Sequence, residues 1–270
     1  MPGIYSFLKR QALHYLPEPL LRSMKARYYA RMLRSLTLDQ EPDLLVVQHL
    51  VEPGDTVLDV GANIGVYTRV LSDLVGPAGR VISVEPTPQT FSILTYGIRS
   101  LGLTNVRAIN AAASDREAAV TIEVPKYHDG GENYYEAHIV EGEGDGRSGA
   151  ANRRVRARSV TLDSIADGLG PVAFVKCDVE GHELACITGA ESLVSSHGPA
   201  WLIEVSGDPD VRGTSASRLF ELLENQSYAP WFFDGEKVAR RHPGDRSTNY
   251  FFLSEAHVAR LEARVPGLVR

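Results

Sequence analysis

The fold is decided by Val57-Leu58-Asp59-Val60-Gly61-Ala62-Asn63-Ile64-Gly65-Val66-Tyr67-Thr68. Its apolar, β-branched start predicts a strand, the glycines predict a tight turn, and the residues after them can begin a helix. Gly61 and Gly65 allow the backbone to turn sharply and to approach a ligand where a Cβ would clash. Such a strand–turn–helix unit is typical of nucleotide-type sites in α/β sheets, and Asp59 is placed to receive a cationic group of the ligand.

The glycine spacing departs from the dinucleotide-binding fingerprint. G-x-G-x-x-G requires glycine at the positions that Asn63 and Val66 occupy here. An NAD-dependent oxidoreductase is therefore the weaker of two enzyme hypotheses. A ligand with an adenosine and an amino-acid tail but no phosphate fits better, because Asp59 can pair with an ammonium group.

The composition predicts a cytoplasmic protein with one main domain. The chain has 270 residues, 43% of them hydrophobic and 23% charged, and its net charge of −6 argues against a general nucleic-acid coat. Cys177 and Cys186 form no zinc pattern or disulfide framework and are expected to be reduced core residues. No apolar run approaches the ~20 residues of a membrane span, and Lys9 and Arg10 interrupt any secretory leader.

Residues 1–50 predict a helical arm or cap ahead of a catalytic domain over residues 51–270. The first 36 residues carry seven lysines and arginines against one acid, Glu18, with aromatic and leucine residues between them. Three uses remain open: a cap or dimer arm, contact with an anionic membrane surface, or a solvated face. A non-catalytic protein that docks on a membrane or partner through this arm is the alternative from another functional class.

Alternating apolar runs and helical patterns predict a Rossmann-like, seven-stranded α/β sheet with helices on both faces. The strands are expected at 56–60, 80–84, 105–110, 172–177 and 200–205, followed by a terminal antiparallel pair at 231–234 and 250–253. Glu85 ends the second strand and can accept both hydroxyls of a ribose. Ser114 and Asp115 lie in a turn of small residues that leaves room for a flat ring, and they are candidates for hydrogen bonds to an adenine amine.

The later strand ends supply the candidate catalytic groups. Asp178 follows the strand at 172–177, and ligands of open parallel sheets bind beyond such carboxyl ends. His182 is a candidate general base, because its pKa lies near working pH, although a structural role at a helix start is the alternative. Glu204 is an acid in an apolar strand end, and a buried carboxylate requires a cationic, metal or hydroxyl partner.

A polar, glycine-rich insert of about 126–154 predicts a lid on the substrate side of the site. Tyr134, Tyr135 and His138 are its candidate substrate-contacting residues. Tyrosine rings stack on sugar or polyketide surfaces while their hydroxyl groups form hydrogen bonds. This composition indicates a hydroxyl-bearing acceptor.

The motifs in combination resemble the FkbM family of class I S-adenosylmethionine-dependent methyltransferases, over about residues 50–255. The resemblance lies in Asp59-Val60-Gly61-Ala62-Asn63-Ile64-Gly65, Val84-Glu85-Pro86, Thr161-Leu162-Asp163 and Lys176-Cys177-Asp178-Val179-Glu180-Gly181-His182-Glu183. It implies that Asp59, Gly61, Asn63, Gly65 and Glu85 surround the cofactor and that residues 178–183 lie near the methyl acceptor. The basic arm lies outside the resemblance.

The expected reaction is O-methylation of a sugar, glycolipid or polyketide-type natural product. The cofactor's methyl group is already activated, so the protein must align an acceptor oxygen and remove its proton. Asp178, His182 or Glu204 is the candidate base, acting directly or through water. Mg²⁺ shared by Asp178 and Glu204 is the alternative, with a metal-free route preferred and the metal ligands left unknown. Acceptor identity and a homodimer stay open.

Overall fold

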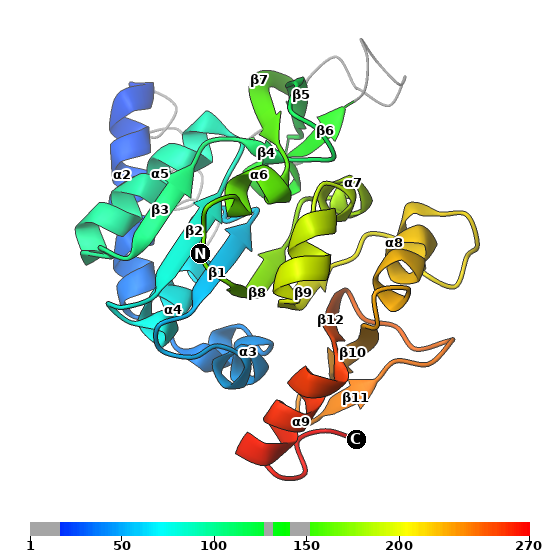
Figure 1. Cartoon of the computed structure of the whole chain (residues 1–270). Coiled ribbons are helices and arrows are strands. Elements are labelled where there is room, and N and C mark those ends of the chain that lie inside the picture. The colour runs from blue at the N-terminus through cyan, green and yellow to red at the C-terminus, as the bar shows by residue number, and fades with distance from the viewer. Residues whose placement is uncertain (1–16, 127–131, 141–151) are drawn as a thin grey trace, which may run out of the picture.

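The computed structural model describes residues 17–126, 132–140 and 152–270. Its central sheet runs in the spatial order β11-β10-β12-β9-β8-β1-β2-β3 (Figure 1). Neighbours among β9, β8, β1, β2 and β3 are parallel, and β12, β10 and β11 continue the sheet by antiparallel pairing. The bounds are β1 (Thr56–Val60), β2 (Arg80–Val84), β3 (Val106–Ile109), β8 (Val172–Cys177), β9 (Ala200–Glu204), β10 (Ala229–Phe233), β11 (Val238–Arg240) and β12 (Asn249–Leu253).

The predicted doubly wound α/β sheet is confirmed, but it has one strand more than the seven expected. The additional strand is β11, which lies between the two strands of the predicted terminal pair. Its three residues are too few to show a strand period in the sequence. They pair with β10, with Trp231 opposite Arg240, and the backbone of Val238 bonds to Leu268 near the chain end. Tertiary pairing therefore determines this strand.

Helices cover both faces of the sheet, as the buried strands require. Val57 packs in one core with α3 and α4, whereas its neighbour Leu58 packs in a second core with α6, α7 and α8. Adjacent residues of one strand therefore face opposite helix layers. The helices are α2 (Glu18–Arg34), α3 (Leu44–Leu50), α4 (Val66–Val75), α5 (Pro88–Leu101), α6 (Leu162–Ala166), α7 (Glu183–Thr188), α8 (Ser215–Glu224) and α9 (Glu255–Arg264).

The helical region after Asp178 is divided in two. α7 ends at Thr188, and a separate π-helical turn spans Leu193–His197. Gly189 follows α7 in close contact with another segment, because a Cβ there would lie 2.1 Å from the Ser114 carbonyl oxygen. The side chain of Asp163 accepts hydrogen bonds from the backbone N–H groups of Ser192 and Leu193, at the start of the π-helical turn.

A smaller sheet stands at one edge of the main sheet, at the top of Figure 1. Its order is β4-β7-β5-β6, made from β4 (Ala112–Ala113), β7 (Arg153–Val160), β5 (Ala119–Val124) and β6 (His138–Val140). The predicted lid of 126–154 is thus partly sheet: β6 pairs with β5, with Ile139 opposite Ile122, and β7 already begins at Arg153. Positions 127–131 and 141–151 of that segment lie outside the described residues.

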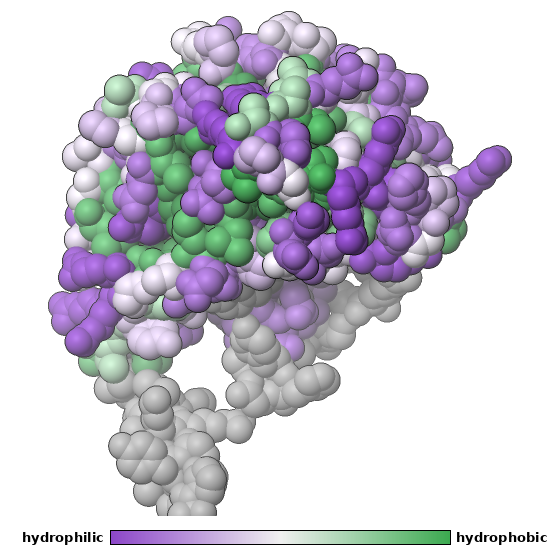
Figure 2. All heavy atoms as spheres, turned by 90° about the horizontal axis from the view of Figure 1, so that it is seen from below, coloured by the Kyte–Doolittle hydropathy of each residue, from purple (hydrophilic) through white to green (hydrophobic). Residues whose placement is uncertain are grey.

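The described part of the predicted N-terminal arm packs on the catalytic domain. α2 lies along α5 (Figure 1), and Arg34 Nη2 donates to the Ser100 carbonyl at 3.2 Å. The outer face of α2 exposes Leu20, Met24 and Tyr28 at four-residue spacing. Figure 2 shows the molecule from below, and on this face apolar side chains reach the surface in patches between charged ones. No helix among the described residues is long and apolar enough to span a membrane.

Candidate active site

The loop between β1 and α4 requires glycine at its first position. Gly61 has φ +76°, and a Cβ on it would lie 1.6 Å from the carbonyl oxygen of Asp178. Its N–H donates to the Val84 carbonyl of β2 at 2.9 Å. Asn63 also adopts a positive φ of 48°, which asparagine tolerates better than most residues. The loop therefore draws the carboxyl ends of β1, β2 and β8 together around one point.

Glu85 forms the wall of a cavity at this point. Its Oε2 accepts the N–H of Asn63 at 3.0 Å, and its Oε1 accepts the N–H and hydroxyl of Thr87 at 2.9 and 2.6 Å. Burial raises the pKa of this carboxyl to about 7. A carboxylate offers about four acceptor positions, so at least one remains for a ligand hydroxyl. This geometry fits the predicted ribose contact.

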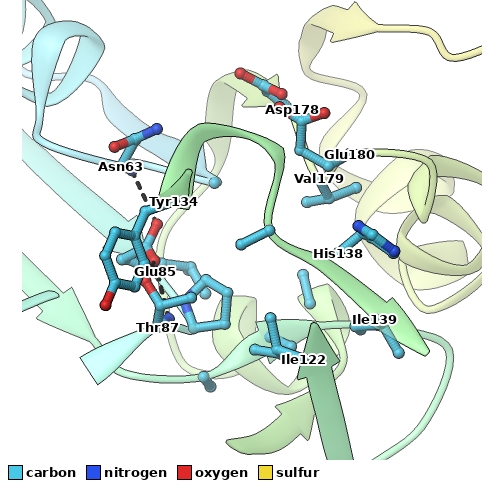
Figure 3. Close-up of a pocket in the computed structure, with 17 residues that line it drawn as sticks. Asn63, Glu85, Thr87, Ile122, Tyr134, His138, Ile139, Asp178, Val179 and Glu180 are labelled. Atoms are coloured by element: carbon cyan, nitrogen blue, oxygen red, sulfur yellow. Dashed lines mark hydrogen bonds between the residues drawn. The ribbon is translucent and has the colours of Figure 1, made fainter. Parts of the chain in front are cut away.

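The cavity beside Glu85 is lined from two sides by residues of the strand ends and the insert (Figure 3). Glu85, Thr87 and Tyr134 lie along one side, and Asp178, Val179 and Glu180 lie on the opposite side. Ala111, Ala112 and Ala113 add small side chains to the lining, which leaves room for a flat ring. The space is about 580 Å³ with its open mouth, within the usual range of ligand sites.

The three predicted substrate residues have different outcomes. Tyr134 and His138 line the cavity beside Glu85, and so they lie at the adenosine-type site as well as in the insert. Tyr134 also donates its hydroxyl to Glu132, and His138 Nδ1 lies 3.0 Å from the Glu136 carbonyl. The side chain of Tyr135 is outside the described part of the structure. Their contact with an acceptor stays a prediction.

A second cavity adjoins the first and shares Gly61, Asn63 and Asp178 with it. Its lining includes Asp59, Glu204 and Asn249, and the space is about 930 Å³ with its mouth. The buried Oδ1 of Asn249 accepts no hydrogen bond from any described group. Carboxylates and an unused amide oxygen suit a cationic ligand group, so this cavity fits the amino-acid tail and sulfonium of the cofactor.

Asp59 lies at the bottom of this second cavity and is only 1% exposed. Thr68 Oγ1 donates to its Oδ2 at 2.5 Å, and the same hydroxyl lies 2.8 Å from Ser83 Oγ. Burial raises the pKa of Asp59, and the nearby Lys176 ammonium opposes that rise. The predicted pairing of Asp59 with a ligand ammonium stays a prediction that the position of its carboxylate permits.

Lys176 lines the second cavity and was not among the predicted site residues. It lies in β8, is 5% exposed, and places its Nζ 2.6 Å from Asp178 Oδ2 and 5.1 Å from the centre of the Tyr67 ring. Burial by itself lowers the pKa of Lys176, but the Asp178 and Asp59 carboxylates raise it on balance. The available signal was a lysine inside the apolar run 172–177, since a buried lysine requires an acidic partner.

Glu180 lies in the segment 178–183 that the resemblance placed near the methyl acceptor, but it was not among the predicted catalytic residues. It adopts φ +53°, an uncommon conformation for a glutamate, and its side chain lines the cavity beside Asp178 (Figure 3). Burial, followed by the charges of Asp178 and Glu204, raises the pKa of Glu180 to about 7. No described residue forms a hydrogen bond or ion pair with its carboxylate. Sequence alone offered only its place before Gly181, which suits a helix start equally well.

Glu204, a predicted catalytic acid, ends β9 in the wall of the second cavity. Burial and the neighbouring Asp178 raise its pKa, while Lys176 opposes the rise. Asp178, Glu180 and Glu204 therefore meet where the two cavities join, and their mutual repulsion favours taking up a proton or a cationic group. No group of three or more His, Cys, Asp or Glu residues within 17–126, 132–140 and 152–270 is arranged to hold a metal ion.

Three further predicted residues do not line either cavity. His182 Nε2 and Ser114 Oγ share a hydrogen bond of 2.9 Å, and Ser114 Oγ also donates to Asp115 Oδ1 at 3.1 Å. The structure brings these residues together behind the cavity wall, which Ala111 to Ala113 form instead. Their expected contacts, with a substrate proton for His182 and with adenine for Ser114 and Asp115, stay predictions that the geometry does not support.

Both cysteines lie in the core, as expected. Cys177 and Cys186 are buried free thiols whose sulfur atoms are 3.6 Å apart. Cys177 ends β8 directly before Asp178, and Cys186 lies on α7. They pack α7 against the strand that is followed by Asp178.

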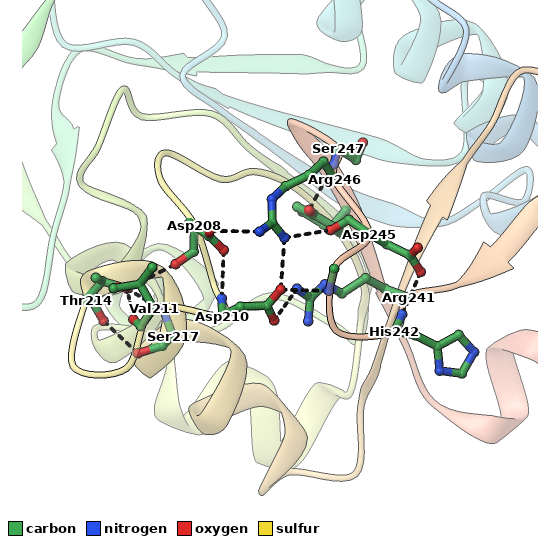
Figure 4. A network of polar contacts seen from close by, with 12 residues as sticks. Asp208, Asp210, Val211, Thr214, Ser217, Arg241, His242, Asp245, Arg246 and Ser247 are labelled. Carbon is green, nitrogen blue, oxygen red and sulfur yellow. Dashed lines mark hydrogen bonds and ion pairs between the residues drawn. The ribbon is translucent and has the colours of Figure 1, made fainter.

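A network of ion pairs links loops that follow and precede the strands of the antiparallel part of the sheet (Figure 4). Asp210 accepts hydrogen bonds from Arg241 at 2.5 Å, Arg246 at 2.8 Å and the Gly244 N–H at 2.8 Å. Arg246 also reaches Asp208 at 2.9 Å. The network joins the loop after β9 to the loop before β12, the two strands whose ends carry Glu204 and Asn249. The hydrogen bond from Arg241 holds the pKa of Asp210 well below its usual range.

Comparison with known proteins gives the following matches. The family model described as the methyltransferase FkbM domain matches residues 59–230. The crystal structure of the FkbM methyltransferase from Methylobacillus flagellatus KT is 20% identical at a TM-score of 0.46, covering 79% of this chain and 50% of that one. The ribosomal RNA large subunit methyltransferase E of Acidithiobacillus ferrooxidans is 38% identical over 72 residues, 27% of this chain and 31% of that protein. The protein-L-isoaspartate O-methyltransferase of Methanococcus aeolicus is 34% identical over 59 residues, 22% of this chain and 27% of that protein.

The chain spans less than a third of the length of these curated relatives. The FkbM domain match is much longer, because residues 59–230 make up well over half of the chain. It begins at Asp59 and includes Glu85, Asp178, Glu180 and Glu204, the residues that surround the two cavities. The match to a methyltransferase domain supports the methyltransferase hypothesis over the NAD-dependent oxidoreductase hypothesis. The chain therefore belongs to the FkbM family of S-adenosylmethionine-dependent methyltransferases.

Proposed function

We propose that this protein transfers the methyl group of S-adenosylmethionine to a hydroxyl oxygen of a sugar, glycolipid or polyketide-type acceptor. The observation that carries the proposal is the Glu180 carboxylate, which has no described partner, lines the cofactor cavity and has a pKa near 7. The cofactor supplies an activated methyl group. An attacking hydroxyl must lose its proton, and a base whose pKa lies near working pH serves that need.

The neighbouring acids have other roles in the proposed reaction. Asp178 is held by the Lys176 ammonium at 2.6 Å, so it is suited to accept a hydrogen bond and orient the acceptor hydroxyl. Glu204 on the next strand is the second candidate base, because burial and Asp178 raise its pKa. His182 is the weakest of the predicted bases, since its ring nitrogen is engaged with Ser114.

The metal-free route is the one we favour. Lys176 places a positive charge beside Asp178, where a shared Mg²⁺ would otherwise balance the two strand-end acids Asp178 and Glu204. Titration with S-adenosylhomocysteine in Mg²⁺ and again in chelator tests this. We expect the affinity for S-adenosylhomocysteine to be equal in both conditions. The rate of methyl transfer is then measured in chelator, and an unchanged rate supports the metal-free route. Loss of transfer in chelator would contradict it.

The acceptor class is tested with paired compounds. Sugars and polyketide fragments with a free hydroxyl are compared with matched amines, and the release of S-adenosylhomocysteine is measured together with the mass of the product. Methylation of oxygen in the hydroxyl series is expected. Methylation confined to nitrogen would overturn the hydroxyl assignment. Failure to bind S-adenosylhomocysteine at all would favour the non-catalytic docking protein instead.

A further inference from the structure

The outer face of α2 concentrates the exposed apolar side chains of the protein. Four large apolar side chains are exposed among the described residues, and three of them lie on this helix: Leu20 at 47%, Met24 at 48% and Tyr28 at 66%. Their spacing of four residues aligns them along one side of the helix, and we call them the apolar stripe of α2. Apolar side chains gathered in this way mark an interaction surface more often than single exposed ones do.

The inner face of the same helix is occupied by the rest of the protein. Ala26, Ala30 and Leu33 are buried, and α2 packs along α5. Leu33 lies against α5 so closely that a Cβ on Gly97 would be 3.4 Å from its Cδ1. Packing on α5 therefore uses one side of α2 and leaves the apolar stripe on the other.

The charge beside the stripe is positive. Arg27 lies three positions after Met24, and Arg31 lies three positions after Tyr28, a spacing that puts residues on the same helix face. Both arginines are exposed, and no described residue forms an ion pair with either of them. α2 and α5 together contain one acid, Glu18, although the net charge of the chain is −6.

A lipid surface fits this face better than a protein does. A stable protein interface uses about 20 residues or more on each side, far more than the stripe and its two arginines offer. A helix in a membrane interface needs only apolar side chains that enter the acyl boundary and basic side chains that meet anionic headgroups. Tyrosine is enriched at that depth, because its ring is apolar and its hydroxyl stays hydrated.

We propose that the outer face of α2 docks this protein on the surface of an anionic lipid bilayer. The apolar stripe enters the outer part of the bilayer, and Arg27 and Arg31 pair with lipid phosphates. The contact is peripheral and reversible, because three side chains bury little apolar area and salt screens the attraction between the charges. This docking does not depend on the proposed O-methyl transfer.

Docking through α2 also brings the site close to the bilayer. Leu21 and Tyr29 of the same helix line a cavity that shares Asn63 and Tyr134 with the cofactor cavity. A helix resting on the surface therefore holds this cavity within about one helix diameter, ~10 Å, of the lipid headgroups. An acceptor carried by the membrane would be presented near the methyl donor.

Co-sedimentation of the full chain with phosphatidylglycerol vesicles tests the charged part of the face, with phosphatidylcholine vesicles as the neutral comparison. Arg27→Gln/Arg31→Gln removes two charges from α2. The control Arg212→Gln/Arg218→Gln removes the same charge from exposed positions before and within α8, on the other side of Figure 1. We expect binding to phosphatidylglycerol vesicles to weaken about tenfold or more in the first variant and to stay unchanged in the second.

The apolar part of the face is tested in the same assay. Leu20→Gln/Met24→Gln/Tyr28→Gln should weaken binding to phosphatidylglycerol vesicles about tenfold or more, because the stripe no longer enters the bilayer. The control Val211→Gln changes the fourth exposed apolar side chain, which lies away from α2, and should leave binding unchanged. Binding of the wild type should also weaken as the salt concentration rises.

Three results would overturn the proposal: no binding of the wild type to phosphatidylglycerol vesicles, equal binding to phosphatidylcholine vesicles, or an equal loss in the control variants. Sedimentation equilibrium without lipid tests another occupant. A dimer that the stripe variant dissociates would assign the face to a second copy of the chain and would also overturn the proposal.

The docking proposal and the proposed function fail in different ways. All variants should bind S-adenosylhomocysteine with wild-type affinity, which shows that they are folded. If vesicles bind as expected but no hydroxyl compound is methylated, only the proposed O-methyl transfer is refuted. If a soluble hydroxyl compound is methylated but vesicles do not bind, only the docking proposal is refuted.

Discussion

Replacing Glu180 with glutamine should stabilise the protein at high pH while it removes the proposed base. In the folded protein the pKa of Glu180 rises from 4.5 to about 7, through burial and the charges of Asp178, Glu204, Glu183 and Glu136. The folded state therefore holds this proton more strongly than the unfolded state. Folding stability is lost as the pH rises from about 4.5 to about 7, and it stays lost above that range. Glutamine is neutral throughout.

The magnitude follows from the size of the pKa change. A rise from 4.5 to about 7 corresponds to a ceiling of about 3.4 kcal/mol, at ~1.36 kcal/mol per pH unit. Glu180 is only partly buried, so solvent screening reduces the realised gain to about 1–2 kcal/mol. For a chain of this size that gain raises Tm by about 2–6 °C at pH 8. Little difference is expected at pH 4.5, where the carboxyl is protonated in the folded state and about half protonated in the unfolded state.

Thermal unfolding of wild type, Glu180→Gln and the exposed control Glu191→Gln at pH 4.5 and pH 8 measures this effect. The gain should appear only for Glu180→Gln and only at pH 8, and methyl transfer there should fall by about 10²-fold or more. Affinity for S-adenosylhomocysteine should stay close to that of wild type. A Tm difference that is the same at both pH values, or that Glu191→Gln reproduces, would refute the reasoning.

Two further substitutions test how the cavities are built. Gly61→Ala should lower the unfolding free energy by about 3 kcal/mol or more, because its Cβ would lie 1.6 Å from the Asp178 carbonyl oxygen. The control Gly170→Ala places its Cβ in open space and should change the unfolding free energy by less than about 0.5 kcal/mol. Urea unfolding measures both. Lys176→Met should destabilise the fold by about 3 kcal/mol at pH 8 and by less at lower pH, because burial raises the pKa of Asp59 and protonation of Asp59 relieves part of the unpaired negative charge. A pH-independent loss in thermal unfolding would contradict the ion-pair explanation.

The sequence predicted the parallel part of the sheet well, and the reason is local. The strands at 56–60, 80–84 and 172–177 are apolar runs between turn residues, and they are buried on both faces as such runs require. Asp59, Glu85 and Asp178 were placed at the site because a residue at the carboxyl end of a parallel strand lies at one edge of the sheet. Chain order and strand direction were sufficient for that inference.

Contacts between distant segments had no comparable signal. β11 exists because of its pairing with β10, and the lid became partly strand because β6 pairs with β5. Ser114 and His182 are 68 positions apart in the chain, yet they share a hydrogen bond, and neither lines the cavity. No periodicity or motif in one sequence reveals such a pair.

By itself, then, the sequence determined the class of fold, the glycine loop and the acids at the strand ends, since each depends on burial and backbone conformation within a short segment. Only the tertiary structure decided which of those acids is available for chemistry. Asp178 is engaged by Lys176, Ser114 engages His182, and Glu180 has no described partner in the cavity wall. The pKa of a carboxyl depends on its burial and on the charges around it, and packing brings those charges together from separate strands.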